Sequence, residues 1–437
     1  MPSSLTTQGD DIDAAPIAAS ARVADAAPAG QRRLALALVA FLAVVGVLSA
    51  RAVSKLNVPG APNGTDWGLS DFRDAVYYPE RAFLDGKDPY DYEHVLRTYP
   101  IGNGFPVYSP ITFLVHLPFG LLPYRTAELA YFLTTIALTV VLAWLALVLS
   151  GAPGDAPRVL AVAAALLASR PGHQNLLLGQ TTLPIVIGAY IALHWARTRP
   201  WVAAAGLVLS SIKPNWIAPL AVLMLLRRDT RPVLIGAALA GLGALVGLVV
   251  LAASPGALAA VLAAAQQNFE GWNTSVIVLP TSSWLRVDAW AFFGRFAGSD
   301  LGLAAKIATS LLILGGSAVA LLRLHRQATP AARHVSLAVT CLATLLCIHH
   351  QSYDLLFLAA PIVGLALADD ALPARAGRAT WFVLLVLLAI PLLNYAATDT
   401  TLNTFGVTGA AWTAINSING AALLGAWLGY VALALVI

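Results

Sequence analysis

The amino-acid sequence predicts an all-α protein, a polytopic bundle of transmembrane helices, and three observations carry this prediction. Apolar residues make up 58% of the 437 residues, and charged residues make up only 11%. Apolar runs of about 20 residues recur along the chain, and each can cross a hydrocarbon core of about 30 Å. Because backbone polar groups within lipid must pair internally, such runs form helices. The composition therefore argues against a soluble protein.

The first element expected is a polar tail. Residues 1–30 are rich in Ala, Ser and Asp and show no apolar period, so we expect a disordered cytoplasmic segment. This stretch is too polar, and too long before the first apolar run, to be a cleaved secretory signal. Residues 31–437 are expected to form one transmembrane domain.

Twelve spans follow, and a count between ten and thirteen is compatible with the pattern. We place them at 34–53, 126–150, 158–169, 181–196, 200–212, 215–227, 232–253, 301–322, 335–348, 354–368, 379–396 and 409–435. Positive side chains in the short loops indicate the orientation. With the N-terminus in the cytoplasm, the short outer loops hold only Arg170 and Lys213, and the arginines of the other short loops lie inside. Two long segments, 54–125 and 254–300, then lie outside.

The first long outer segment is expected to contain a helix that lies on the membrane surface. Apolar and aromatic residues recur at helical spacing from Phe72 to Leu84, and Gly86 is a suitable end. Pro79 lies within this stretch and leaves open a division into two helices. Residues 110–122 are apolar but too short to cross a membrane, which favours an interfacial or re-entrant piece.

Two of the spans are short. Residues 158–169 and 200–212 each contain only about a dozen apolar residues before a polar turn. Short helices place such turns below the membrane surface, where non-helical backbone is tolerated if it lines a cavity. We therefore expect Arg170, His173, Gln180 and Lys213 to line a pocket on the outer side, partly within the bilayer.

Polar residues at the ends of different spans converge on that outer side. They are Asp71, Asp74, Gln180, Lys213, His349 and Asp354. This arrangement indicates an active site at a membrane surface, assembled from segments that lie far apart in the sequence.

The two aspartates of the first outer segment are candidates for a catalytic base. Asp71 and Asp74 are three residues apart near the start of the surface helix, so both can face one side. A carboxylate within hydrogen-bond reach of a sugar hydroxyl is a suitable general base. The alternative is an N-cap followed by a solvated acidic face.

The cationic and imidazole side chains are candidates for binding phosphate. Lys213 lies between two apolar runs, where an ionisable residue is a functional candidate and an ammonium can bind phosphate. The alternative is snorkelling to the outer headgroups. His349 and His350 end a span and can donate to phosphate or relay a proton, unless they are simply polar residues at the interface. Gln180 and Arg170 are further candidates beside them.

Several other chemistries have no support in the sequence. The basic residues cluster between spans and form no patch that would suggest nucleic-acid binding. No Cys/His cluster has zinc spacing, and no Gly-rich phosphate loop follows a strand. Cys341 and Cys347 are six positions apart in one expected helix and face different directions, which favours neither a disulfide nor a metal pair. We expect no metal and no cofactor.

A series of short motifs occurs in order along most of the chain from residue 34 onward. They are Asp71 in Ser-Asp-Phe, Tyr77-Tyr78, Gly-Lys-Asp-Pro-Tyr at 86–90, Tyr108-Ser109-Pro110, Leu117-Pro118, Gly179-Gln180, Lys213-Pro214, His349 and Tyr353-Asp354. Their order resembles glycosyltransferase family 87, which includes the actinobacterial polyprenol-phosphate-mannose-dependent α-1,2-mannosyltransferases. The family's usual Tyr-Pro-Pro is Tyr-Ser-Pro here. The spacing from Asp71 to Gly86 is one residue longer than is typical, which keeps Asp74 as an alternative base.

The resemblance implies a GT-C architecture and a lipid-linked sugar donor. In that family the aspartate of the first outer loop is the general base of an inverting transfer, a role that falls here on Asp71 or Asp74. The residues expected to contact substrate or the departing phosphate are Lys213, His349, His350, Gln180, Arg170 and Tyr77. The partners implied are a polyprenyl-phosphate sugar, a glycolipid or glycan acceptor, and membrane lipids. Mannose is the expected sugar, with arabinofuranose or another hexose as the alternative. The expected location is a bacterial inner (plasma) membrane, with the site on its periplasmic or extracellular face.

Two other classes of protein compete with a transferase. A transporter or lipid flippase places ionisable groups near the bilayer midplane and often shows internal repeats. The halves of this chain show no such repeat, and its polar groups gather toward one face beside a long polar loop. A non-catalytic assembly protein would leave Asp71 and Lys213 replaceable without loss of any chemistry.

Overall fold

The chain is all-helical, as expected. The structure, a computed structural model, describes residues 15–56, 68–102, 108–252, 257–275, 277–327, 329–367 and 377–437. In these ranges β-pairing is limited to two isolated bridges, between Leu56 and Gly68 and between Arg286 and Gln351. Together with the apolar helices described next, this confirms the prediction of a polytopic bundle of membrane helices.

Six helices of the described chain are long and apolar enough to cross a membrane. They are α1 (Ala15–Val53), α6 (Tyr124–Ser150), α12 (Thr230–Leu251), α15 (Leu303–Leu324), α19 (Arg378–Leu393) and α21 (Gly409–Val436). Large apolar side chains such as Leu242, Leu312 and Phe382 are exposed on them. Exposed apolar surface of this extent is suited to a hydrocarbon surrounding.

Shorter apolar helices complete the bundle and are more deeply buried. They are α7 (Ala156–Ala168), α9 (Thr182–Trp195), α10 (Pro200–Ser210), α11 (Pro214–Leu226), α16 (Pro330–Leu346), and the 3-10 helix η2 (Ser352–Leu358) with α17 (Ala359–Leu367). The long and short helices together fall on the twelve segments expected from the sequence, to within five residues at each end except at the start of α1.

The contact between α9 and α10 depends on two glycines. A Cβ atom at Gly188 would lie 2.4 Å from the carbonyl oxygen of Gly206, and a Cβ atom at Gly206 would lie equally close to the carbonyl oxygen of Gly188. Small residues of this kind let helix backbones approach closely in membranes. The Ser210 hydroxyl then donates to the carbonyl oxygen of Ile185 at 2.9 Å across the same contact.

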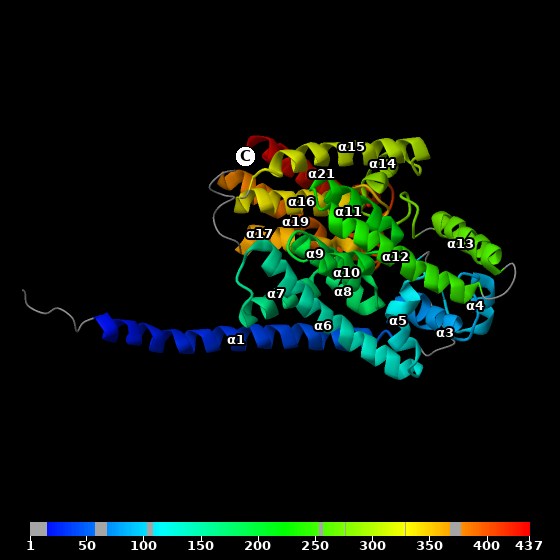
Figure 1. Ribbon diagram of the computed structural model, residues 1–437, viewed down its shortest axis with the longest axis horizontal. Coiled ribbons are helices and arrows are strands. Elements are labelled where there is room, and N and C mark those ends of the chain that lie inside the picture. Colours follow the sequence, from blue (N-terminus) through cyan, green and yellow to red (C-terminus); the bar gives the residue numbers. More distant parts are fainter. Residues whose placement is uncertain are drawn as a thin grey trace, which may run out of the picture.

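The N-terminal segment differs from the expectation. A disordered tail was expected through residue 30, but α1 begins at Ala15 and extends beyond the rest of the bundle (Figure 1). Alanine has the highest intrinsic helix propensity, and residues 15–30 are rich in it, which accounts for a helix without an apolar period. The first fourteen residues lie outside the described part of the chain.

Short helices gather at one end of the bundle, on the right in Figure 1. They are α2 (Ser70–Phe72), the π-helix η1 (Arg73–Tyr77), α3 (Tyr78–Leu84), α4 (Tyr92–Thr98) and α5 (Thr112–Gly120). The first three form one helical segment, as expected near 71–84, and most of its side chains are buried in the protein. Gly86, with φ of +69°, follows its end. Pro79 does not divide this helix. It lies in the first turn of α3, where proline is tolerated, and the π-helical turn η1 directly precedes that turn.

The remaining helices connect the spans, and all of them except the 18-residue α13 are short. They are α8 (Arg170–Leu178), α13 (Ala257–Thr274), α14 (Ala289–Ala297), the 3-10 helix η3 (Tyr395–Ala397) and α20 (Asp399–Thr404). Of these, α8 matters most for the site because it packs on η2 and leads directly into Gly179 and Gln180.

Candidate active site

A close approach of two segments brings Asp71 and Gln180 together. Gly179 ends α8 with φ of +70°, and a Cβ atom there would lie 2.7 Å from the Cβ atom of Phe72. The backbone N–H of Leu69 donates to the carbonyl oxygen of Leu177 at 2.7 Å, which holds the start of α2 against the end of α8. Glycine meets both demands because it has no Cβ atom and tolerates positive φ.

Asp71 is a half-buried carboxylate with two side-chain partners. Gln180 Nε2 donates to Asp71 Oδ2, and the Ser70 hydroxyl lies 3.4 Å from Asp71 Oδ1. Burial, and next the negative charge of Asp74, raise the pKa of Asp71 to about 7, against the opposing effects of Ser70, Lys213 and Arg73. A carboxylate with this pKa can take up and release a proton near neutral pH.

Asp74 has a different set of partners from Asp71. Arg73 Nε and Nη2 donate to its two oxygens at 2.6 and 3.1 Å, and the backbone N–H of Gly102 donates to Oδ2 at 3.2 Å. Both members of the ion pair are buried. Although the two aspartates are three residues apart, Asp74 is bound to its neighbour and to the loop after α4, whereas Asp71 is bound across the bundle.

Lys213 forms a buried ion pair that joins three segments. Its Nζ atom donates to Asp354 Oδ1 at 3.0 Å, and Thr182 Oγ1 donates to the same oxygen at 2.8 Å. The ammonium also lies 4.9 Å from the centre of the Tyr353 ring. Asp354 in turn accepts from the backbone N–H of Gln351, so that the carboxylate also caps the start of η2.

Tyrosines join the turn at Gln180 to the segment that contains Tyr90 and Tyr108. Tyr131 of α6 donates to the carbonyl oxygen of Gln180 at 3.1 Å, and Thr181 donates to the hydroxyl of Tyr108 at 3.3 Å. Tyr90 donates to the carbonyl oxygen of Tyr108 at 2.7 Å. Tyr108 and Tyr90 belong to motifs seen in the sequence. Tyr131 was missed, because within an apolar span it gives no local signal.

The two histidines lie beside an ion pair that the sequence did not reveal. Arg286 Nε and Nη2 donate to Asp288 at 2.9 and 2.8 Å, and the backbone N–H of His350 lies 3.5 Å from Asp288 Oδ2. Burial, and next the charge of Arg286, lower the pKa of His349 to about 3, so its imidazole is neutral at pH 7. The Arg-x-Asp spacing at 286–288 was the available signal for this pair.

The structure places two other predicted residues in backbone contacts. Arg170 is fully buried and donates to the carbonyl oxygens of Trp284 and Ala397 at 3.0 and 2.8 Å, and to that of Asn394 at 3.2 Å. Tyr77 donates to the carbonyl oxygen of Leu122 at 2.9 Å and packs in an aromatic cluster with Phe72, Tyr78 and Tyr124.

A cavity of about 180 Å³ borders Gln180 between α5, α6 and α9. Its lining is largely apolar, with His116, Tyr131 and Thr135 as polar members. Burial lowers the pKa of His116 to about 4, and its Nδ1 atom lies 3.0 Å from the hydroxyl of Thr112. The amide of Gln180 therefore lies between this cavity and the carboxylate of Asp71.

The fold and the site together define a membrane protein in which ionisable side chains from separate segments meet at the ends of its helices. The family model of glycosyltransferase family 87 matches residues 106–348. This is more than half of the chain, so the protein belongs to glycosyltransferase family 87 and is a membrane glycosyltransferase. Neither the curated proteins nor the solved structures gave a match. Gln180, Lys213 and Asp288 lie within the matched residues, whereas Asp71 precedes them and His349 follows them directly.

Proposed function

We propose that this enzyme transfers mannose, with inversion, from a polyprenyl-phosphate donor to a hydroxyl of a glycolipid or glycan acceptor. The observation that carries the proposal is the carboxylate of Asp71, which is hydrogen-bonded to Gln180 and has a pKa of about 7. A general base acts best when its pKa lies near the working pH. The ordinary pKa of an aspartate would make it a far weaker base.

The proposed reaction is a single displacement. Asp71 accepts the proton of the acceptor hydroxyl while the oxygen of that hydroxyl bonds to the anomeric carbon of the donor. The bond between this carbon and the donor's phosphate oxygen breaks, and its electron pair leaves with the polyprenyl phosphate. Attack on the face opposite the leaving phosphate inverts the anomeric centre. Phosphate is already a good leaving group, so this scheme requires neither a metal nor a cofactor.

Lys213, His349 and His350 are the proposed partners of the departing phosphate. An ammonium has three N–H donors, and Asp354 accepts one of those of Lys213. The neutral imidazole of His349 can donate one N–H. His350 donates through Nδ1 to the carbonyl oxygen of Gln351, so its Nε2 atom, which has no partner among the described residues, donates to the phosphate only when the ring is protonated. Donors aimed at the site where negative charge develops stabilise the transition state.

The other predicted residues take supporting roles in this proposal. Gln180 orients the base through its amide, and the cavity beside it admits a lipid-borne substrate from the membrane. Asp74 holds the first outer segment in place because Arg73 and Gly102 already occupy its oxygens. Arg170 and Tyr77 support the walls of the site through the carbonyl oxygens to which they donate.

The identity of the sugar rests on the resemblance to the mannosyltransferases of the family, and arabinofuranose or another hexose is the alternative. The decisive assay is transfer of radiolabelled mannose from polyprenyl-phosphate-mannose by the purified protein in lipid nanodiscs, with membrane glycolipid extract as acceptor. We expect transfer by the wild type and by a folded Asp74→Asn variant, and none by Asp71→Asn. Activity in Asp71→Asn would assign the base elsewhere. A folded wild type that is inert toward every lipid-linked sugar would favour a transporter.

The proposed outer location of the site has its own test in whole cells. Lys87 is exposed after α3, and Thr230 is exposed at the start of α12, on the opposite side in the proposed topology. In a chain with both native cysteines replaced by alanine, an impermeant thiol reagent should label Lys87→Cys in intact cells, and should label Thr230→Cys only after lysis. The reverse pattern would place the site in the cytoplasm.

A further inference from the structure

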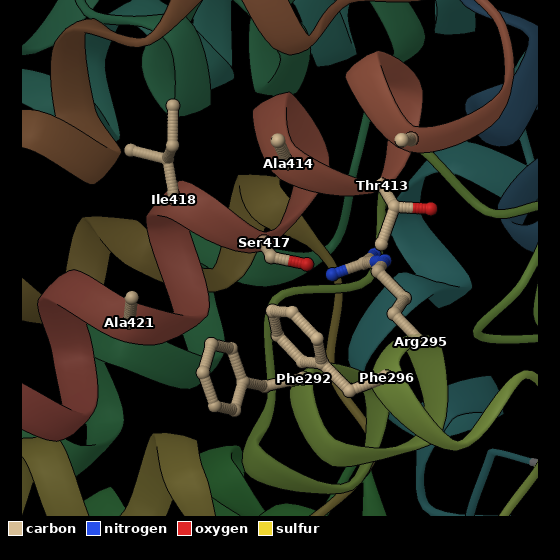
Figure 2. A pocket seen from close by; sticks show the side chains of 9 residues that line it. Phe292, Arg295, Phe296, Thr413, Ala414, Ser417, Ile418 and Ala421 are labelled. Carbon is tan, nitrogen blue, oxygen red and sulfur yellow. The ribbon is translucent and has the colours of Figure 1, made fainter.

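A groove between α14 and α21 is separate from the cavity beside Gln180, and the proposed transfer does not use it. Its volume is about 640 Å³, which lies within the range of ligand pockets. Phe292 and Phe296 of α14 form one wall, and the first half of α21 forms the other (Figure 2).

The wall on α21 is a stripe of small residues on one helix face. Its members are Ala410, Ala414, Ser417 and Ala421. At a rise of 1.5 Å per residue the stripe is about 16 Å long, close to the depth of one leaflet of a core of about 30 Å. The groove therefore has the length of one acyl chain in one half of the membrane.

A cation with an unused donor lies in this groove. Arg295 donates through Nε to the carbonyl oxygen of Pro280, through Nη1 to that of Asn416, and through Nη2 to those of Ser283 and Arg286. A guanidinium has five N–H groups, so one on Nη1 is left without an acceptor among the described residues. In that part of the chain no carboxylate lies within ion-pair distance of Arg295.

Ser417 supplies a second unused polar group beside it. Its side chain is only 4% exposed, and its hydroxyl has no hydrogen-bond partner in the described chain. Figure 2 shows this hydroxyl and the Arg295 guanidinium directed toward one another across the groove. A buried polar group without a partner is costly, and a buried cation without a counter-ion costs more.

We propose that the groove binds one acyl chain of an anionic membrane phospholipid, with the lipid phosphate at Arg295 and Ser417. The phosphate provides the missing negative charge and accepts the hydrogen bonds that both side chains can still donate. Burial lowers the pKa of Arg295 to about 10, against the opposing effect of the charge of Asp288, which lies beyond ion-pair distance. The guanidinium also lies 5.9 Å from the centre of the Trp412 ring.

Two features favour a phospholipid over the sugar donor as the occupant. The α14–α21 groove lies apart from α3 and α5, which adjoin Asp71, as Figure 1 shows. The stripe on α21 also matches one leaflet, whereas a polyprenyl chain is much longer. The phospholipid would brace the second outer segment, because Arg295 holds the carbonyl oxygen of Arg286, whose side chain pairs with Asp288 beside His350.

The test is lipid binding to the delipidated full-length protein, followed by native mass spectrometry. The probes are phosphatidylglycerol, phosphatidylcholine with identical acyl chains, and a long-chain polyprenyl phosphate. The groove is filled by Ala414→Leu with Ala421→Leu, since both alanines are exposed and the added atoms enter open space. The matched control is Ala432→Leu, an exposed position of α21 outside the groove. Ser417→Ala removes one proposed contact with the phosphate without adding bulk.

We expect the wild type and the control to retain one phosphatidylglycerol, at least about tenfold more tightly than phosphatidylcholine. The filled variant should lose this binding, and Ser417→Ala should weaken it. Equal retention by the filled variant, or equal affinity for the two phospholipids, would overturn the proposal. Tighter binding of polyprenyl phosphate than of phosphatidylglycerol would also overturn it and assign the groove to the donor. The readout is binding, so its outcome does not depend on the proposed transferase reaction.

Discussion

The pH dependence of transfer is the sharpest test of Asp71 as the base. Its pKa of about 7 is raised chiefly by burial, so the carboxylate form that accepts a proton is depleted below neutral pH. We expect kcat/KM to fall about tenfold for each pH unit below 7, to about a tenth of the plateau at pH 6 and about a hundredth at pH 5. Above pH 8 the ionisation of Asp71 should cause no further change in kcat/KM, because its carboxyl is then almost fully ionised.

The assay is single-turnover transfer in nanodiscs between pH 5 and pH 9, with the fold checked at each pH. A second buried carboxyl, Glu80, provides the control. Burial raises its pKa to about 8, and neither of its oxygens has a hydrogen-bond partner in the described chain. Glu80→Gln should leave the inflection near pH 7 unchanged. An inflection near pH 4, or one that disappears in Glu80→Gln, would refute the assignment to Asp71.

Three further predictions follow from the contacts around the site. Gly179→Ala should destabilise the protein by more than the ~1–2 kcal/mol that an alanine in the left-handed conformation costs, because the added Cβ atom would clash with Phe72. The same change should reduce transfer. The control for both thermal unfolding and activity is Gly298→Ala, where φ is similar and the added Cβ atom enters open space. Lys213→Met should lower the free energy of unfolding by about 3–5 kcal/mol because it leaves Asp354 buried and unpaired. Adding Asp354→Asn should restore most of this stability but not the transfer, and restored transfer would remove Lys213 from the site. The carboxyl of Glu80 binds a proton more tightly in the folded protein than in the unfolded chain. The stability that this proton contributes to the fold is therefore present at low pH and is lost as pH rises from 4.5 toward 8. Glu80→Gln should therefore raise the melting temperature more at pH 8 than at pH 5, and an equal change at both would refute this.

The spans were predictable from sequence because their signal is local. An apolar run of sufficient length forms a helix in lipid whatever its neighbours are. The same reasoning located Asp71, Gln180 and Lys213 at span ends on one side. It gave no sign of the helix over residues 15–30, because alanine-rich sequence supports a helix without an apolar period.

The pairings within the site were not predictable in the same way. Lys213 and Asp354 are 141 residues apart, and Asp71 and Gln180 are 109 apart, so their contacts depend on how the bundle packs. For Asp74, spacing along the helix did not predict the contacts that the structure shows. Helical spacing suggested that it shares a face with Asp71, but the salt bridge to the adjacent Arg73 gives it different partners.

The π-helical turn η1 explains how a longer loop can keep the same chemistry. A π-helix closes each hydrogen bond one residue later than an α-helix, so it accommodates an added residue as a local bulge. The resemblance to the family implies that the segment from Asp71 to Gly86 is one residue longer than is typical, and η1 lies within this segment. The insertion thus need not lengthen the helix or rotate its end relative to its start. Asp71 can stay against Gln180 at one end while the aromatic side chains that follow stay packed at the other, so the loop can change length without changing its two anchors.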